Sequence, residues 1–194
     1  MTVPTSLPLL REAVANGAKL ELLFFPDAGS RTSPLGPGCL SQWCPCEFEM
    51  DGIPFRSAEQ GMMHGKAILF GDRETAARIA ACRTAFRAQS LGREVLGFDE
   101  ARWAAHREEI VFRANLAKFS QDAELRSYLV TTTGKVLAES STTDLVWGAG
   151  VSPDHPAASD PRRWPGLNLL GFVLMQVREE LLPPATPPPA LPIR

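Results

Sequence analysis

The order of apolar and polar positions along the chain predicts a few short strands followed by many helices. The apolar run Leu20–Phe25 indicates a buried strand, and the Pro-, Gly- and Ser-rich segment 26–38 indicates a loop that is a candidate lid. Segments 47–50 and 53–55 flank Asp51-Gly52, which predicts a type I′ hairpin because both central residues of that turn need positive φ.

The middle and the end of the chain follow the helical period of apolar residues. Four helices are expected to begin after residues whose side chains cap free backbone N–H groups, namely Ser57, Asp72, Thr84 and Asp99. The last of these is expected to extend to about Phe119. The remaining expected elements are a helix over 122–132, a strand over 135–140 and an apolar helix over 167–182.

Composition and charge limit the classes of protein to consider. The chain has 194 residues, of which 44% are hydrophobic and 22% charged, and this is typical of one globular domain with a substantial core. A formal net charge of −2 without blocks of like charge disfavours an extended nucleic-acid duplex as partner, although a small anionic ligand fits. No long apolar run or basic leader is present, so we expect a cytoplasmic protein without membrane contact.

The four cysteines do not form a metal motif. Cys44 and Cys46 are separated by one residue, whereas zinc sites use two or more intervening residues and a second ligand pair. The three histidines are scattered along the chain. We therefore expect reduced thiols and no metal.

The segment Ser57–Lys66 carries the strongest chemical signal. Ser57 and Gln60 have the spacing of a capping box, which places Glu59 in the first turn of a helix. Lys66 lies seven residues after Glu59, so the two side chains share a face at about 10 Å along the axis, enough room for a sugar. The alternative is an exposed Glu and an exposed Lys that flank a buried apolar stripe.

Five ordered segments together resemble the NADAR, or YbiA-like, family, which is named for a proposed link to NAD and ADP-ribose. These segments are LSQWCPCEFEMDGIPFRSAEQGMMHGKAILFGD, LGREVLGFD, RANLAKFSQDAELRSYL, VLAESSTTDLVWGAG and WPGLNLLGFVLMQVREEL. The resemblance implies a single compact α+β domain, predominantly helical, with a short hairpin and a few short strands. It covers residues 20–182, which leaves an N-terminal extension over 1–19 and a Pro-rich tail over 183–194 that we expect to be disordered.

The resemblance also implies an activity, because characterised members cleave N-glycosidic bonds. It carries the family's Glu and Lys onto Glu59 and Lys66 and places Asp144 in an acidic and aromatic loop. Glu59 is then the acid/base or electrostatic group. Lys66 either donates a hydrogen bond to sugar or phosphate or attacks the anomeric carbon to form an imine. Asp144 would orient water or a ribose hydroxyl, unless it only caps its loop.

Seven further residues are expected to bind the substrate. The indoles of Trp43 and Trp147 suit stacking on a base, with core packing as the alternative. The Asn168 amide suits a hydroxyl or base edge, with helix capping as the alternative, and Arg93 suits a phosphate, with an exposed position in the turn as the alternative. The complete set is Gln42, Trp43, Met63, Arg93, Trp103, Trp147 and Asn168.

Two departures from the family pattern affect the expected pocket. Gly61 stands where members commonly have an aromatic residue, and His64-Gly65 replaces a pair that is usually Ala followed by a polar residue. Loss of the ring at position 61 is expected to enlarge or reshape the pocket wall and to alter the substrate.

The leading hypothesis is a metal-independent N-glycosidase without a cofactor, acting on a phosphoribosyl or ADP-ribosyl nucleobase conjugate like the intermediates of riboflavin biosynthesis. One alternative is removal of ADP-ribose from a modified guanine in nucleic acid, taken as a single extruded base. The other alternative is a binding module that recognises ADP-ribose or a related nucleotide without turnover.

Overall fold

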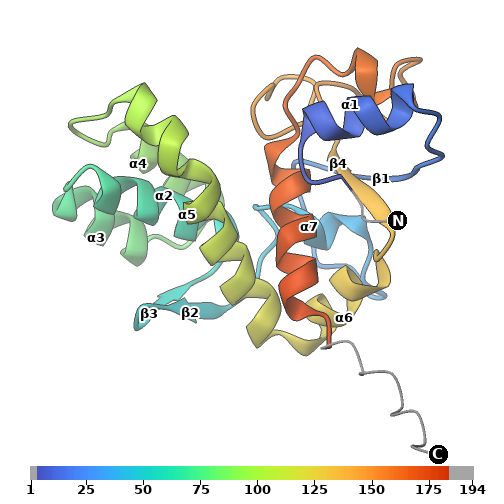
Figure 1. The fold of residues 1–194 in the computed structure, drawn as a ribbon. Helices are drawn as coiled ribbons and strands as arrows, with labels where there is room; N and C mark the ends of the chain where they lie inside the picture. Colours follow the sequence, from blue (N-terminus) through green and yellow to red (C-terminus); the bar gives the residue numbers. More distant parts are fainter. Residues whose placement is uncertain (1–3, 184–194) are drawn as a thin grey trace, which may run out of the picture.

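The computed structural model describes residues 4–183 (Figure 1). Within that range the chain forms α1 (Leu7–Ala15), β1 (Glu21–Phe25), the short 3₁₀ helix η1 (Pro37–Leu40), β2 (Phe48–Met50), β3 (Ile53–Phe55), α2 (Ala58–Leu69), α3 (Arg73–Ala81), α4 (Ala85–Arg93), α5 (Glu100–Gln121), α6 (Ala123–Thr131), β4 (Lys135–Glu139), the 3₁₀ helix η2 (Pro161–Arg163) and α7 (Leu169–Leu181). The predicted α+β class, mainly helical with a few short strands, is confirmed.

The long helix α5 is the central element of the fold. Figure 1 shows α2, α3 and α4 gathered on one side of α5, with α7, β1 and β4 on its other side. The buried side chains of both groups belong to one continuous apolar core. The end of β4 thus lies on the other side of α5 from the helices α2–α4.

The predicted helix starts are confirmed by their caps. The side chains of Ser57, Asp72, Thr84 and Asp99 each accept a hydrogen bond from the backbone N–H three residues later, at 2.7–3.2 Å. The predicted capping box is wrong in one detail. The side-chain oxygen Oε1 of Gln60 accepts from the backbone N–H of Arg56, not of Ser57, and the side-chain Nε2 donates to the carbonyl of Ile79 in α3 at 2.8 Å.

The predicted hairpin is also confirmed. Strands β2 and β3 pair antiparallel around Asp51 and Gly52, whose φ values are 54° and 76°. Glycine reaches this left-handed region without steric cost, and aspartate is among the few other residues that tolerate it. The hairpin leads directly to Ser57 and fixes where α2 begins.

The other two strands form a parallel pair that joins distant parts of the chain. β1 pairs with β4 in the register Phe25↔Glu139, and the backbone N–H of Ser140 donates to the carbonyl of Phe25. The expectation of a buried strand over 20–25 was too strong, since only Phe25 is fully buried and the preceding residues are partly exposed. This pairing brings the end of β1 and the end of β4 to one place.

The N-terminal extension contains a helix that the apolar pattern did not predict. α1 is nine residues long and begins with Pro at its first turn, and the Arg11 guanidinium donates to the carbonyls of Pro161 and Trp164. The expectation of a disordered tail falls on residues that, apart from Pro183, lie outside the described part of the chain. Within residues 4–183 no helix has both the length and the apolar character that a bilayer crossing requires.

Candidate active site

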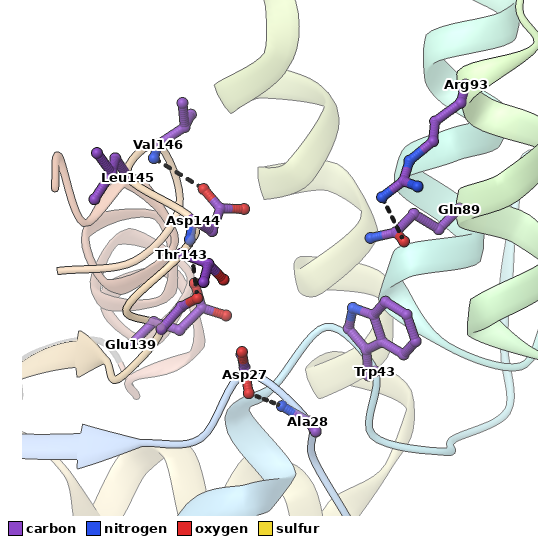
Figure 2. A pocket seen from close by; sticks show the side chains of 11 residues that line it. Asp27, Ala28, Trp43, Gln89, Arg93, Glu139, Thr143, Asp144, Leu145 and Val146 are labelled. Carbon is purple, nitrogen blue, oxygen red and sulfur yellow. Dashed lines mark hydrogen bonds between the residues drawn. The ribbon is translucent and has the colours of Figure 1, made fainter. Parts of the chain in front are cut away.

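Two adjoining cavities lie between the α2–α4 helices and the end of β4. The inner cavity has a volume of about 200 Å³ and is lined by residues that include Glu59, Met63 and Lys66. The outer cavity, of about 570 Å³, is drawn in Figure 2. Both share five lining residues, Trp43, Gln89, Arg93, Glu139 and Asp144. The two cavities are therefore parts of one cleft.

Glu59 lies at the bottom of the cleft, in the first turn of α2. Its backbone N–H donates to the carbonyl of Gln42 at 2.9 Å, and the residue is 3% exposed. Burial raises the pKa of Glu59 to about 8, and the nearby Asp144 carboxylate adds to the shift. The helix N-terminus favours the ionised form, but desolvation outweighs it at this depth. The carboxyl group therefore holds a proton at neutral pH.

Lys66 follows Glu59 two turns along α2 and lines the same inner cavity. Its Nζ donates to the carbonyl of Gly92 at 2.9 Å and lies 4.4 Å from the centre of the Phe98 ring. Burial lowers the pKa of Lys66. Among the described residues Lys66 forms no salt bridge with Glu59, and both side chains line the inner cavity.

Asp144 contributes an oriented carboxylate from the loop after β4. One of its oxygens, Oδ1, accepts from the backbone N–H groups of Val146 and Trp147, both at 2.8 Å. Figure 2 shows the bond with Val146. This is the loop-capping arrangement considered for the residue, and it fixes the side chain while the group lines both cavities. The capping and the cavity-lining positions are therefore compatible.

Glu139 is a cleft residue that the sequence analysis missed. It is the last residue of β4 and is 5% exposed, and its Oε2 has no hydrogen-bond partner among the described residues. Burial raises the pKa of Glu139 to about 8, with Asp144, Asp27 and Glu59 adding repulsion. The sequence does contain a feature that could have indicated Glu139 as a site residue. It is a charged residue at the end of an apolar strand, five residues before Asp144 and in the same family-like segment.

The opposite wall is formed by Trp43 and by two residues of α4. In Figure 2 the Trp43 indole, Gln89 and Arg93 face the acidic side chains of Asp144, Glu139 and Asp27 across the cavity. Arg93 Nη2 donates to Gln89 Oε1 at 3.2 Å. The cleft thus has an acidic wall and a wall that offers one aromatic face and one guanidinium group.

Most of the other predicted binding residues also reach the cleft. Gln42, Met63 and Trp147 line the inner cavity, and Gln42 Oε1 accepts from Asn115 Nδ2 at 2.8 Å. Trp103 lies behind Lys66, with its ring 5.7 Å from Nζ, and is not among the lining residues. The structure therefore places Trp103 as a support for Lys66.

Asn168 lies apart from the cleft. Its side chain is fully buried, with Nδ2 donating to the carbonyl of Leu137 and Oδ1 accepting from the backbone N–H of Glu139. It has a left-handed φ of 56° before α7 and makes no side-chain cap hydrogen bond. The amide thus holds β4 against α7, and the side chain positions Glu139 without lining either cavity.

The expectation that Gly61 reshapes the pocket is wrong. A Cβ at this position would face Ala114 Cβ at 3.2 Å, with Phe48 and Met50 beyond it, so Gly61 allows α2 to pack closely on α5. His64 lies edge-on to the Phe55 ring, 5.3 Å away, and does not line either cavity. Both departures from the family pattern concern helix packing.

The described residues contain no cluster of three or more metal-ligating side chains. Three of the four cysteines, Cys39, Cys44 and Cys46, are buried free thiols. Burial raises the pKa of Cys39 to about 12 and that of Cys46 to about 11, so both remain protonated.

Fold and cleft together define a helical α+β domain that encloses buried carboxyl groups and a desolvated amine. The model of the NADAR domain matches residues 30–182, most of the chain. The chain therefore belongs to the NADAR domain family, as the five sequence segments indicated.

The relatives include proteins named as N-glycosidases. The chain is 38% identical over 157 residues to N-glycosidase R617 of Acanthamoeba polyphaga mimivirus, covering 78% of this chain and 92% of that protein. It is 39% identical over 80 residues to the chloroplastic riboflavin biosynthesis protein PYRR of Zea mays, which is 41% of this chain and 11% of that protein.

A solved structure confirms the fold. The NMR structure of the Escherichia coli protein YbiA superposes with a TM-score of 0.62 at 22% identity, covering 92% of this chain and 93% of that one. The YbiA sequence, described as an N-glycosidase, is 29% identical over 144 residues, 74% of this chain and 81% of that protein.

Proposed function

We propose that the protein is an N-glycosidase that hydrolyses the bond between a phosphorylated ribose and a nucleobase or base-like ring. The observation that carries the proposal is that the buried carboxyl group of Glu59 and the desolvated amine of Lys66 line one cavity of about 200 Å³. Relatives named as N-glycosidases support the reaction type.

The residues of the cleft suit the steps of such a hydrolysis. The bond from C1′ to nitrogen breaks with its electron pair on nitrogen, which takes up a proton, while a nucleophile bonds to the oxocarbenium-like C1′. Glu59 is the principal acid/base group. Asp144, held by two backbone N–H groups, orients the water or a ribose hydroxyl. Lys66 either hydrogen-bonds the sugar or attacks C1′.

The two walls of the cleft suit a substrate of phosphoribosyl type. Trp43 and Trp147 offer faces on which a planar base stacks. Arg93 is the basic residue among those lining the outer cavity, opposite Asp27 and Asp144. Because a single guanidinium faces two carboxylates, the cavity can compensate little negative charge on a ligand. A substrate with one phosphate group therefore suits it better than one with a diphosphate. The riboflavin pathway relative, PYRR of Zea mays, is consistent with a phosphoribosyl substrate.

We also propose that the reaction needs no metal ion or cofactor. Proton transfer by a carboxyl group and stabilisation of an oxocarbenium-like C1′ by a carboxylate supply this chemistry without a metal ion. Turnover is therefore expected to be the same with and without EDTA, and a loss of activity that added Mg²⁺ or Zn²⁺ restores would contradict this.

The proposed activity is tested with the purified chain and a panel of four compounds. These are a phosphoribosylaminouracil, NAD, ADP-ribosylated guanosine and free ADP-ribose. Release of base and ribose 5-phosphate from the first compound is the expected result, and Glu59→Gln should abolish it. The matched control is Glu49→Gln, which removes an exposed carboxyl group on β2. Tight binding of ADP-ribose without turnover of any compound would identify a binding module.

A further inference from the structure

We propose that Glu139 is the general acid of the cleft, the group that protonates the departing nitrogen. The inference rests on the proposed N-glycosidase function and adds a catalytic residue to it. Neither the apolar pattern nor the family-like Glu and Lys singled out this side chain.

Glu139 stands where the inner and outer cavities meet. The inner cavity holds Glu59 and Lys66, and the outer cavity holds Asp27 and the residues after Ser141. A ribose beside Glu59 and a base in the wider cavity would be joined by a bond that crosses the boundary between the two. Glu139 lines both cavities and therefore stands at that boundary.

The side chain of Glu139 has an unsatisfied oxygen. Glu139 is 5% exposed, and its buried Oε2 has no hydrogen-bond partner among the described residues. An unpaired buried polar atom is costly, and an atom of this kind that also lines a cavity is placed to pair with a ligand. In Figure 2 the Glu139 side chain extends toward the open cavity, between those of Asp144 and Asp27.

The surroundings of Glu139 favour its protonated form. The charged groups around it are Asp144, Asp27 and Glu59, all carboxyl groups, with Arg93 on the opposite wall. Burial and this repulsion both raise the pKa of Glu139, and no described cation pairs with it. A carboxylic acid of this kind has a proton to give at neutral pH.

The backbone at Glu139 is held by three sets of hydrogen bonds. Its N–H donates to Asn168 Oδ1 at 3.0 Å, its carbonyl accepts from Ala149 at 2.9 Å, and β4 pairs with β1 at Phe25. A general acid must be held within hydrogen-bond reach of the atom that it protonates. Asn168 is thus a positioning residue for Glu139.

The C1′–N bond breaks, its electron pair stays on nitrogen, and the proton of Glu139 moves to that nitrogen. The nucleophile, water or the Lys66 amine, bonds to C1′ and gives a proton to the ionised carboxylate of Glu59. Both glutamates hold a proton in the free protein at neutral pH, so the active form is the fraction in which Glu59 has lost its proton to solvent and Glu139 has kept its own. After product release, the proton on Glu59 returns to Glu139 through solvent.

The test compares two leaving groups. An aminopyrimidine riboside phosphate needs a proton on its departing nitrogen, whereas 4-nitrophenyl ribofuranoside 5-phosphate releases a stable anion without one. Glu139→Gln should lower kcat by about 10²–10⁴-fold on the first substrate and leave the rate on the second nearly unchanged. Glu59→Gln should lower both rates, and the control Glu49→Gln neither.

The outcomes separate the two proposals. If the wild-type protein cleaves neither substrate, the N-glycosidase function fails. If it cleaves the aminopyrimidine substrate and Glu139→Gln either keeps full activity or loses both activities equally, Glu139 is not the general acid. A second readout needs only the natural type of substrate: the alkaline decline of kcat/KM should be present in the wild type and missing from the residual activity of Glu139→Gln. A decline that persists unchanged would also overturn the assignment.

Discussion

The buried ammonium of Lys118 donates a hydrogen bond to the main-chain carbonyl of Ser41 across 2.8 Å. A second bond, of 2.7 Å, reaches the carbonyl of Cys39, so one side chain of α5 fixes the segment that leads to Gln42 and Trp43. Asn115, one turn earlier on α5, binds Gln42 directly. Buried polar side chains of the central helix α5 therefore hold in place the segment that carries Trp43.

Replacement of Lys118 by Met should loosen that wall. Two buried carbonyls lose their donor, and an unpaired buried polar group costs about 1–3 kcal/mol. We expect the free energy of unfolding in urea to fall by about 2–4 kcal/mol and KM to rise more than kcat falls. Lys19→Met, at an exposed position, is the matched control. An unchanged KM in a folded Lys118→Met protein would show that the segment holds its place without the ammonium.

The stability of the protein should decrease as the pH rises from 5 to 8.5. Glu59 and Glu139 have pKa values of about 8 in the folded protein, and the ordinary value of 4.5 applies to the unfolded chain. Between these values the folded state binds more protons than the unfolded state, so the free energy of unfolding falls with pH. The slope is at most about 1.4 kcal/mol per pH unit for each group.

Urea unfolding of the Glu59→Gln, Glu139→Gln double variant tests this dependence, because the difference from the wild type cancels all other titrating groups. As the pH rises, the free energy of unfolding of the double variant should increase relative to that of the wild type. At pH 8.5 the double variant should be the more stable protein. If the free energies of unfolding of the two proteins change with pH in parallel, the folded structure does not raise the pKa of either carboxyl group.

Borohydride should trap an adduct on Lys66 during turnover. Burial lowers the pKa of Lys66 and increases the fraction of neutral amine, which is the nucleophilic form. Attack on C1′ followed by opening of the ribose gives an imine, and borohydride reduces it to a stable secondary amine that mass spectrometry locates. Turnover without any adduct would show that Lys66 does not attack C1′ and only donates a hydrogen bond to the sugar. In that case Lys66→Arg should retain activity.

Gly61→Ala should leave substrate preference unchanged. The added Cβ faces Ala114 at 3.2 Å, on the side of α2 that packs on α5 and away from both cavities. The gain in helix propensity of about 1 kcal/mol is opposed by the tight contact, so stability should change by no more than about 1 kcal/mol. The check is the ratio of kcat/KM for two substrates with different bases. A changed ratio would show that this helix face communicates with the cleft.

The local parts of the fold were predictable from the sequence because local chemistry determines them. Four capping residues placed four helix starts, and Asp51-Gly52 placed the hairpin. The α1 helix was missed because a nine-residue helix with Pro in its first turn has too few apolar repeats for a periodic signal. The pairing of β1 with β4 depends on residues more than a hundred positions apart, and no local pattern encodes it.

The cleft was predictable where two residues share one helix. Glu59 and Lys66 sit seven positions apart, and the helical period places them on one face. Glu139 enters the cleft only because β4 ends beside β1, so its role follows from tertiary structure. For Asn168 the sequence suggested a ligand-binding residue, because an amide can bind a hydroxyl group or a base edge. In the structure its side chain forms its hydrogen bonds within the protein, to Glu139 and Leu137. The residue type alone does not distinguish an internal partner from a ligand.

The parallel register of β1 and β4 also affects how the protein acquires its chemistry during synthesis. The hydrogen bond from Ser140 to Phe25 spans 115 positions, and the wall with Glu139 and Asp144 lies beyond it. Contacts of such high sequence separation form late, after the cost of closing a long loop has been met. A ribosome-bound chain that has exposed α2 but not β4 carries Glu59 and Lys66 without the opposing wall. An unfinished chain therefore has only part of the cleft until β4 has been made and has paired with β1.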